Sequence, residues 1–194
     1  MSARSDDALT LREARARYFR ENGFGDGGGY EKRWVHVKLG PVPFAFPNTQ
    51  ARVRAVRYHD LHHVVTGYAT DVVGEAEIGA WEIGSGCAGF AAAWILNLYA
   101  LVLGLAADAG ATFRAFVRGR RTRNLYRTPW NEGLLASRVG DVRAHLGLAG
   151  AAPAAPTLAD RALFGAWTAA AVALALATLA LLIAPLGWAL AALE

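Results

Sequence analysis

Apolar side chains recur three or four positions apart along much of the chain, which is the spacing of amphipathic helices. Residues Leu9 to Glu21 and Gln50 to Thr66 show this pattern, and Gly67 is placed to end the second of these helices. Another helix is predicted to begin near Asp71, whose side chain suits an N-cap, and to run well past Trp81. These segments predict an all-α fold.

The segments around these helices carry other patterns. Glycines fill the loop from Gly23 to Gly29, and Trp34 to Leu39 alternates in the manner of a short strand or extended segment. A last helix is predicted from Trp130 to Leu146, which closes a helical domain over residues 1–148. Prolines are expected to interrupt regular structure after the short strand: Pro41, Pro43 and Pro47.

An uncharged stretch, Ile83 to Ala107, lies in the middle of the chain. It is long enough to cross a bilayer, but three glycines lie near its start and Asn97 lies in its middle. Three interpretations therefore stand, namely a membrane span, a buried core helix, or two helices packed within an apolar domain.

A second uncharged segment follows an alanine- and proline-rich linker at residues 149–160. Within residues 161–194, Ala162 to Ala184 is long enough to span a bilayer, and Pro185 is expected to kink or end that helix. We favour a membrane anchor over a helix packed on the domain or on a partner subunit. Because arginines crowd its N-terminal side, the domain is expected on the cytoplasmic face of a bacterial inner membrane.

Composition agrees with a membrane or lipid setting. Hydrophobic residues make up 54% of the chain and charged ones 19%, and the net charge of +4 comes almost wholly from arginine. Such a balance suits an acidic membrane surface or a phosphorylated ligand, and nothing supports nucleic acid. Cys87 is the only cysteine, which excludes an intrachain disulfide and a cysteine-based zinc finger. The first residues lack the apolar core of a secretory signal peptide.

The most informative run is HDLHH, residues 59–63, with Glu75 twelve residues after it. Positions four apart share a helix face, so His59 and His63 can direct their imidazoles at one point, while Asp60 lies about 100° round the helix. A turn would bring Glu75 back as a fourth ligand. These ligands suit a divalent metal, zinc first, with iron, manganese or cobalt as alternatives. An open coordination position would allow Lewis-acid chemistry, and a closed site would be structural.

Two other interpretations use the same residues. Histidines four apart often lie on the exposed face of a helix, but four potential ligands in a chain with five histidines favour the metal. His59, His62 and His63 also match HxxHH, a histidine box of membrane di-iron desaturases and hydroxylases. Those enzymes need further boxes, and only His36 and His145 remain.

Two further patterns carry weaker chemistry. Gly23, Gly25 and Gly28 satisfy GxGxxG, but a helix and not a strand precedes them, so no dinucleotide site is expected. The arginines between Arg118 and Arg127 suit either a phosphate or pyrophosphate group or a membrane surface.

The metal motif resembles that of the fourth coenzyme Q biosynthesis protein family, which is marked by HDxxH, eleven residues and Glu. His59, Asp60, His63 and Glu75 match every position of it, and the likeness extends from about Leu9 to Leu148. It includes these further residues: Gly67, Glu77, Trp81, Gly119, Arg120, Arg121, Asn124, Leu125, Tyr126 and Trp130.

The resemblance implies an all-helical fold, a metal usually taken to be zinc, and an apolar groove for a polyprenyl tail. The metal would be held by His59, Asp60, His63 and Glu75. The implied activity is oxidative decarboxylation of a ubiquinone head-group ring, in which the carboxyl-bearing carbon loses carbon dioxide and gains a hydroxyl. Asp60 or a metal-bound water would move the proton.

The implied partners are a prenylated quinone precursor or another isoprenoid lipid, the membrane, other quinone-biosynthesis enzymes, and a second copy in a homo-oligomer. An alternative role is a non-catalytic lipid-binding scaffold that organises those enzymes around a structural metal. The glycine loop and the tail after Pro153 depart from the family, which puts the identity of the lipid in question. Contacts to substrate or lipid are assigned to three residues: Arg120, Arg121 and Tyr126.

Overall fold

The computed structural model describes residues 6–39, 42–150 and 155–191. This part of the chain contains seven helices and one two-stranded sheet, which confirms the predicted all-α fold with an apolar C-terminal helix. The helices are α1 (Leu11–Glu21), α2 (Gln50–Thr66), α3 (Val72–Ser85), α4 (Ala91–Arg120), α5 (Glu132–Ala136), α6 (Val139–Leu146) and α7 (Leu158–Ala191).

The first two helices lie where the apolar pattern predicted them. Thr10 caps α1 by accepting a hydrogen bond from the backbone of Glu13, whose carboxylate accepts one from the backbone of Thr10. α2 ends at Gly67, whose φ of 78° is the left-handed conformation that favours glycine. Leu11 and Leu61 are fully buried in the core cluster that these two helices share.

A hairpin of β1 (Trp34–Leu39) and β2 (Val42–Pro47) lies between α1 and α2 in the chain. The strand prediction for β1 is confirmed. The expected interruption by prolines is wrong at Pro43 and Pro47, because both lie within β2. Each strand of a two-stranded sheet has an unpaired edge, where the missing N–H of proline removes no ladder hydrogen bond. Pro41 lies outside the described residues.

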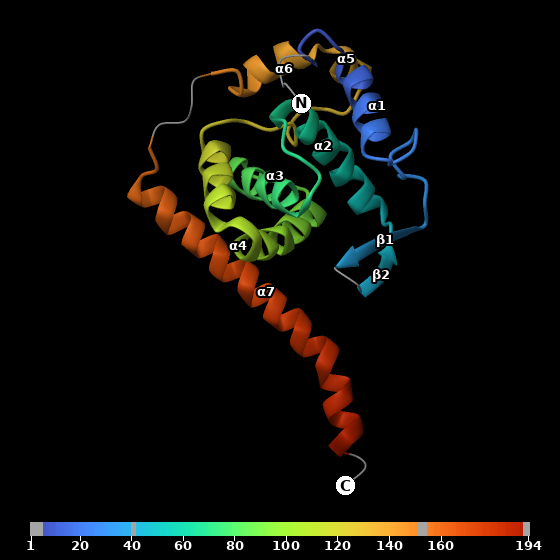
Figure 1. Ribbon diagram of the computed structural model, residues 1–194, viewed down its shortest axis with the longest axis vertical. Coiled ribbons are helices and arrows are strands. Elements are labelled where there is room, and N and C mark those ends of the chain that lie inside the picture. The colour runs from blue at the N-terminus through green and yellow to red at the C-terminus, as the bar shows by residue number, and fades with distance from the viewer. Residues whose placement is uncertain (1–5, 40–41, 151–154, 192–194) are drawn as a thin grey trace.

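The uncharged stretch from Ile83 to Ala107 belongs to two helices and not to one. α3 ends at Ser85, and α4 begins after a short loop. α4 bends sharply at Asp108, where φ is −156° and ψ is 89°, and the Asp108 carboxylate caps the second half of the helix by accepting from the backbone N–H of Ala111 at 2.8 Å. α4 therefore curves around α3 (Figure 1).

Glycines allow α3 and α4 to pack backbone against backbone. A Cβ added to Gly119 would lie 2.2 Å from the carbonyl oxygen of Trp81, and one added to Gly84 would lie 2.3 Å from that of Phe116. Trp81 and Phe116 are themselves buried in the core cluster between these helices. Only glycine fits at the two points of contact, which fixes the position of α3 inside the curve of α4.

The helix predicted from Trp130 to Leu146 is divided into α5 and α6. Ser137 is extended, with φ of −66° and ψ of 143°. Its carbonyl accepts a hydrogen bond from the backbone N–H of Leu11, and the N–H of Val139 donates to the carbonyl of Leu9, both at 2.9 Å. The segment pairs with the start of α1, and this pairing replaces the hydrogen bonds that would have continued the helix.

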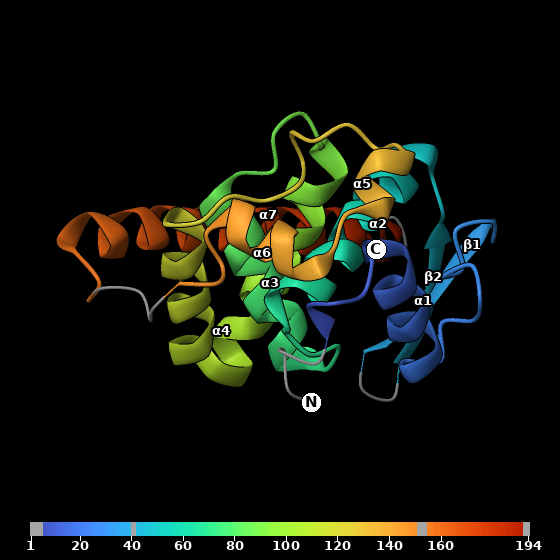
Figure 2. The same ribbon diagram turned by 90° about the horizontal axis from the view of Figure 1, so that it is seen from above.

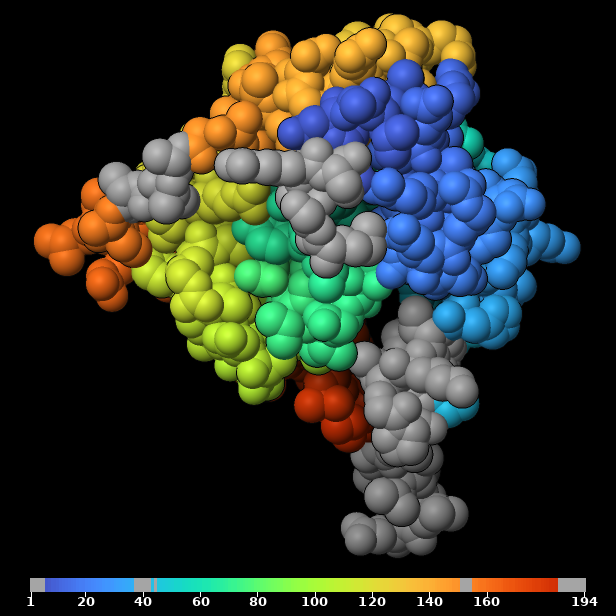
Figure 3. Space-filling model, turned by 45° about the horizontal axis from the view of Figure 1, so that its top comes forward, coloured from blue at the N-terminus to red at the C-terminus, as the bar shows by residue number. Residues whose placement is uncertain are grey.

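α7 packs along α4, so it is not an isolated tail. Trp167 stacks on Trp94 with ring centroids 4.9 Å apart, and the hydroxyl groups of Thr178 and Tyr99 share a hydrogen bond of 2.6 Å. Figure 3 shows α7 (red) emerging beside α3 and α4. The helix continues past Pro185 to Ala191, so of the two expected effects of this proline the structure excludes an end of the helix.

The start of α7 is fixed by one carboxylate. Asp160 accepts hydrogen bonds from the guanidinium groups of Arg120 and Arg121 at the end of α4, and from the backbone and hydroxyl of Thr157.

Of the predicted linker, residues 151–154 lie outside the described part of the chain. By length and composition, α4 and residues 158–184 of α7 could each cross a membrane. Seen from above, the hairpin and the second half of α4 lie on opposite sides of the domain, with α3 between them (Figure 2).

The glycine contacts predict a strong response to a single methyl group. Gly119→Ala should lower the free energy of unfolding by about 1–3 kcal/mol, because the methyl group would overlap a backbone carbonyl that cannot turn aside. Denaturant titration of the protein in detergent micelles measures the change. Gly165→Ala in α7 is the control, because a Cβ there meets nothing within 4 Å; it should leave stability unchanged or raise it by up to about 1 kcal/mol. Equal stability of both variants would contradict the packing.

Candidate metal centre

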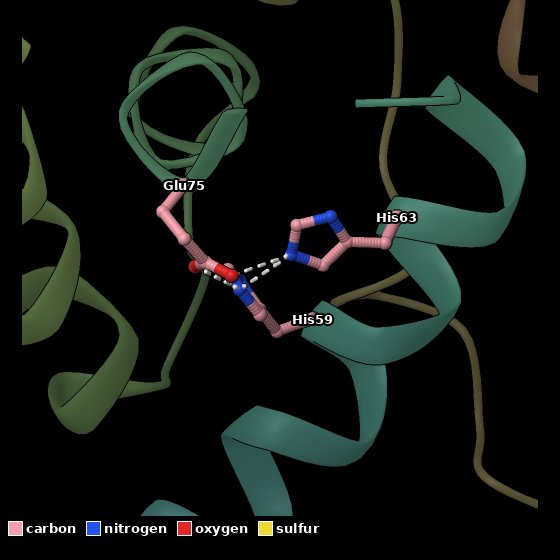
Figure 4. A group of neighbouring side chains, drawn as sticks. All are labelled: His59, His63 and Glu75. Atoms are coloured by element: carbon pink, nitrogen blue, oxygen red, sulfur yellow. Dashed lines mark hydrogen bonds and ion pairs between the residues drawn. The ribbon is translucent and has the colours of Figure 1, made fainter. Parts of the chain in front are cut away.

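Three side chains from α2 and α3 converge on one point (Figure 4). The Nε2 atoms of His59 and His63 lie 3.3 Å and 3.4 Å from the two carboxylate oxygens of Glu75. These potential ligand atoms all lie within 4.8 Å of one another. The two histidines are one helical turn apart on α2, and the short connection from Gly67 to the start of α3 returns Glu75 to them.

The other nitrogen of each imidazole already has a partner. His63 Nδ1 lies 3.0 Å from the backbone carbonyl of Tyr68, and His59 Nδ1 lies 3.0 Å from Glu82 Oε1. A carbonyl and a carboxylate can only accept, so both Nδ1 atoms donate, and the Nε2 atom of each ring carries a lone pair whenever that ring is neutral. Buried partners of this kind orient metal-ligating histidines in known metal sites.

The two Nε2 atoms lie only 3.2 Å apart, beside the carboxylate of Glu75. Two nitrogen lone pairs and an anionic group at such short range repel one another unless a positive charge lies among them. A proton on one imidazole satisfies this need, and so does a divalent metal ion. The donor set therefore fits a metal such as zinc, which takes three protein ligands of these types in catalytic sites and keeps a fourth position open.

The carboxylate of Glu82 positions the histidines of this site. Its side chain is fully buried, and four donors surround it. Oε1 accepts from His59 at 3.0 Å and from His62 at 2.6 Å, and Oε2 accepts from the Asn97 amide at 2.6 Å and the Tyr126 hydroxyl at 2.7 Å. The four donors come from α2, from α4 and from the segment after α4, so one carboxylate joins three parts of the fold.

His62 has a structural role in this network. Its Nδ1 donates to Glu82, and its Nε2 accepts the backbone N–H of Leu125 at 3.0 Å, so the ring is neutral. Burial also lowers the pKa of His62, which favours the neutral ring. Because both nitrogens of His62 are occupied away from His59 and His63, the geometry gives no support to the HxxHH interpretation.

The charges of the site follow from these contacts. Burial opposes ionisation of Glu75, but hydrogen bonds from His59 and His63 outweigh it and lower the pKa of Glu75 to about 2. Burial also opposes the ionisation of Glu82, yet the charge and hydrogen bonds of its histidine neighbours hold its pKa well below the usual value. Burial disfavours a charged His59, but the charge of Glu82 and bonds to both carboxylates raise the pKa of His59 well above the usual value. The site thus attracts positive charge.

Asp60, the fourth predicted ligand, is oriented differently. Its carboxylate accepts a hydrogen bond from the hydroxyl of Tyr30 and is not in the group formed by His59, His63 and Glu75. Burial raises the pKa of Asp60, which favours a bound proton. The structure therefore brings three of the four predicted ligands together and places Asp60 beside them as a buried carboxyl group with a raised pKa.

The site lies in a cleft of about 740 Å³. One wall is polar and is formed by His59, Asp60 and Glu75, with Glu82 behind them. The first half of α4, the glycine loop and the hairpin form further parts of the lining. Apolar and aromatic side chains line these parts: Leu96, Tyr99, Ala100, Leu103, Phe24, Trp34 and Phe46.

The residues assigned to substrate or lipid contacts have other partners in the fold. Arg120 and Arg121 bind Asp160 of α7. Tyr126 donates to Glu82, and burial together with the charge of Glu82 raises its pKa well above the usual value. Tyr126 also lines the cleft.

Sequence analysis did not single out Glu82. The available signal was its position seven residues after Glu75, which is two helical turns and therefore the same face of α3. A carboxylate placed between Trp81 and Ile83, at the start of an uncharged stretch, also indicates a buried and partnered charge. Asn97 gave a similar signal within the same stretch.

Comparisons with protein-family models, with curated proteins and with solved structures find no match to this chain. The resemblance to the coenzyme Q protein family rests on the residues quoted for it.

The network predicts that the Glu82 charge is essential to the fold. Glu82→Gln keeps the shape but leaves buried donors facing an amide NH₂, so the free energy of unfolding at pH 7 should fall by about 3–5 kcal/mol. Denaturant titration measures the loss. Glu77→Gln, on the same helix and outside the network, is the control and should have a much smaller effect.

The pH dependence of this loss has a definite sign. Because the pKa of folded Glu82 lies well below its ordinary value of 4.5, its contribution is fully present above that pH and declines as the pH falls further. The difference in stability between the native protein and Glu82→Gln should therefore shrink below pH 4.5. Equal stabilities at pH 7 would refute the role of the network.

Proposed function

We propose that this chain is a metal-dependent protein of ubiquinone biosynthesis that acts on a prenylated head-group precursor. The observation that carries the proposal is the convergence of His59, His63 and Glu75 beside a cleft that His59 and Glu75 line together with apolar side chains of α4. A prenylated hydroxybenzoate has the same two-sided character, with an anionic ring at one end and a hydrocarbon tail. The match of HDxxH, eleven residues and Glu supports the same assignment.

Each residue of the site has a role in this proposal. His59, His63 and Glu75 would hold the metal, and Glu82 orients His59 through its Nδ1. A divalent ion there supplies positive charge that stabilises negative charge on the oxygens of a bound ring. Asp60, buried and bonded to Tyr30, is placed to hold or release a proton at its carboxylate oxygen. The apolar wall of α4 would accept the prenyl tail and keep water from it.

The proposed reaction replaces the ring carboxyl group by hydroxyl, with release of carbon dioxide. This change removes two electrons, and with dioxygen supplied as the oxidant it balances: the ring carboxylic acid, water and dioxygen give the phenol, carbon dioxide and hydrogen peroxide. Two imidazoles and one carboxylate with open positions suit ferrous iron as well as zinc. The identity of the bound metal therefore bears on the chemistry and is measured together with its amount.

Elemental analysis of purified protein tests the proposal. We expect one equivalent of metal per chain in the native protein and its loss in His63→Ala and Glu75→Ala, because each variant removes one of three ligands. His145→Ala is the matched control, since this histidine is exposed on α6 and should leave the metal content unchanged. Protein purified without chelators that carries no metal would overturn the proposal. Bound metal without turnover of a prenylated hydroxybenzoate would favour the scaffold role.

A further inference from the structure

α7 and the first half of α4 form one continuous uncharged surface. No charged residue occurs from Ile83 to Ala107 or from Ala162 to Leu193. On α4, Ile95 and Leu103 are 49% and 44% exposed, and they are informative because they adjoin further exposed apolar side chains. On α7, large apolar side chains are exposed as well: Leu163, Val172, Leu176, Leu179, Leu181, Leu182 and Ile183.

The face of α7 that is turned toward the domain packs against α4. Phe164 packs on Phe113 and Phe116, Trp167 stacks on Trp94, and Thr178 bonds Tyr99. Ala171, between these contacts, is fully buried. The contacts recur with helical spacing, so α7 stays on the domain from its start to Thr178, and then extends below α4 and the hairpin (Figure 1).

Because α7 packs on α4, the depth of α7 in a membrane would determine the depth of α4. From Trp167 to Thr178 the helix rises by about 16 Å, whereas the hydrocarbon core is about 30 Å thick. A span formed by residues 162–184 therefore carries the contact with Tyr99 into or against the bilayer. α7 cannot enter the membrane and leave the first half of α4 in water.

One face of α4 extends from the contact with α7 to the cleft. Ile95, Tyr99 and Leu103 are four residues apart and share a face. Tyr99 contacts α7, and Tyr99 and Leu103 both line the cleft. The exposed aromatic side chains Phe24 and Trp34 lie on the rim of the same cleft. The cleft thus opens beside the apolar surface.

We propose that a lipid bilayer covers this face, so that Ile95 and Leu103 contact lipid and the cleft opens onto the membrane. The distribution of charged residues around this face favours a lipid bilayer over a second copy of the chain as its partner. Positive residues gather at one border of the face, at the end of α4 and the start of α7, where anionic headgroups would lie. These residues are Arg118, Arg120, Arg121 and Arg161, and the carboxylates beside them are Asp160 and, near Arg118, Glu77. The proposal does not depend on the metal.

Spin labels on single cysteines test the depth of each helix. Leu103→Cys on α4 and Leu176→Cys on α7 are labelled in the full chain and reconstituted into vesicles of phosphatidylcholine and phosphatidylglycerol. Cys87 is fully buried, and the native chain treated with the same label measures any background labelling at Cys87. Asp141→Cys on α6 is the control, because this position is exposed and the buried side chains of α6 belong to the core cluster of α1 and α2. Accessibility to oxygen and to water-soluble chromium oxalate is compared by electron paramagnetic resonance.

We expect the labels at positions 103 and 176 to be reached by oxygen and protected from chromium oxalate, and the label at 141 to show the reverse. Protection at 176 with full chromium access at 103 would overturn the proposal and leave α7 as an anchor that holds the domain in water. Chromium access at both positions, or spin–spin broadening from a second chain, would also overturn it. If Leu103→Cys fails to fold, Ile95→Cys on the same face replaces it.

Discussion

The ionised carboxylate of Glu82, surrounded by four donors in a dry interior, is the interaction on which the rest of the site depends. A buried charge is costly unless every lone pair is satisfied, and here His59, His62, Asn97 and Tyr126 satisfy them. Those donors belong to different elements, so ionisation of one group fixes α2 and the segment after α4 relative to α3. It also fixes the tautomer of His59 and directs its free nitrogen at His63 and Glu75.

The fold separates polar from apolar chemistry across a single cleft. Polar ligands project from α2 and α3, whereas the facing half of α4 has no charge over its whole length up to Asp108. The bend at Asp108 allows α4 to pack on α3 through Gly84 and Gly119 and still present its first half to the cleft. α7 extends this apolar face, so the same packing positions both the ligands and the surface for lipid.

Much of the fold could be predicted from the sequence. The periodicity of α1 and α2, the cap at Asp71 and the stop at Gly67 are local signals, and the structure confirms each of them. The division of α5 from α6 depends on pairing of Ser137 with the start of α1, which spacing along the chain does not encode. The prolines of β2 are tolerated only because the sheet has two strands.

The site could be predicted from the sequence only in part, and the reason is related. His59, His63 and Glu75 converge as their spacing indicated, whereas the orientation of Asp60 depends on Tyr30, a residue from a distant loop. Glu82 was missed because its importance arises from four donors scattered over the sequence. Its distance from Glu75 along α3 and its apolar neighbours in the sequence were the available signals.

X-ray absorption spectroscopy at the metal edge of the purified protein tests the central claim most directly. The account predicts a nearest shell of nitrogen and oxygen, with the outer-shell scattering of two imidazoles and no sulfur. In Glu82→Gln, if it folds, disorder in the imidazole signal should increase, because His59 loses its orienting partner. A shell of oxygen alone, or one containing sulfur from Cys87, would contradict a centre built from His59, His63 and Glu75.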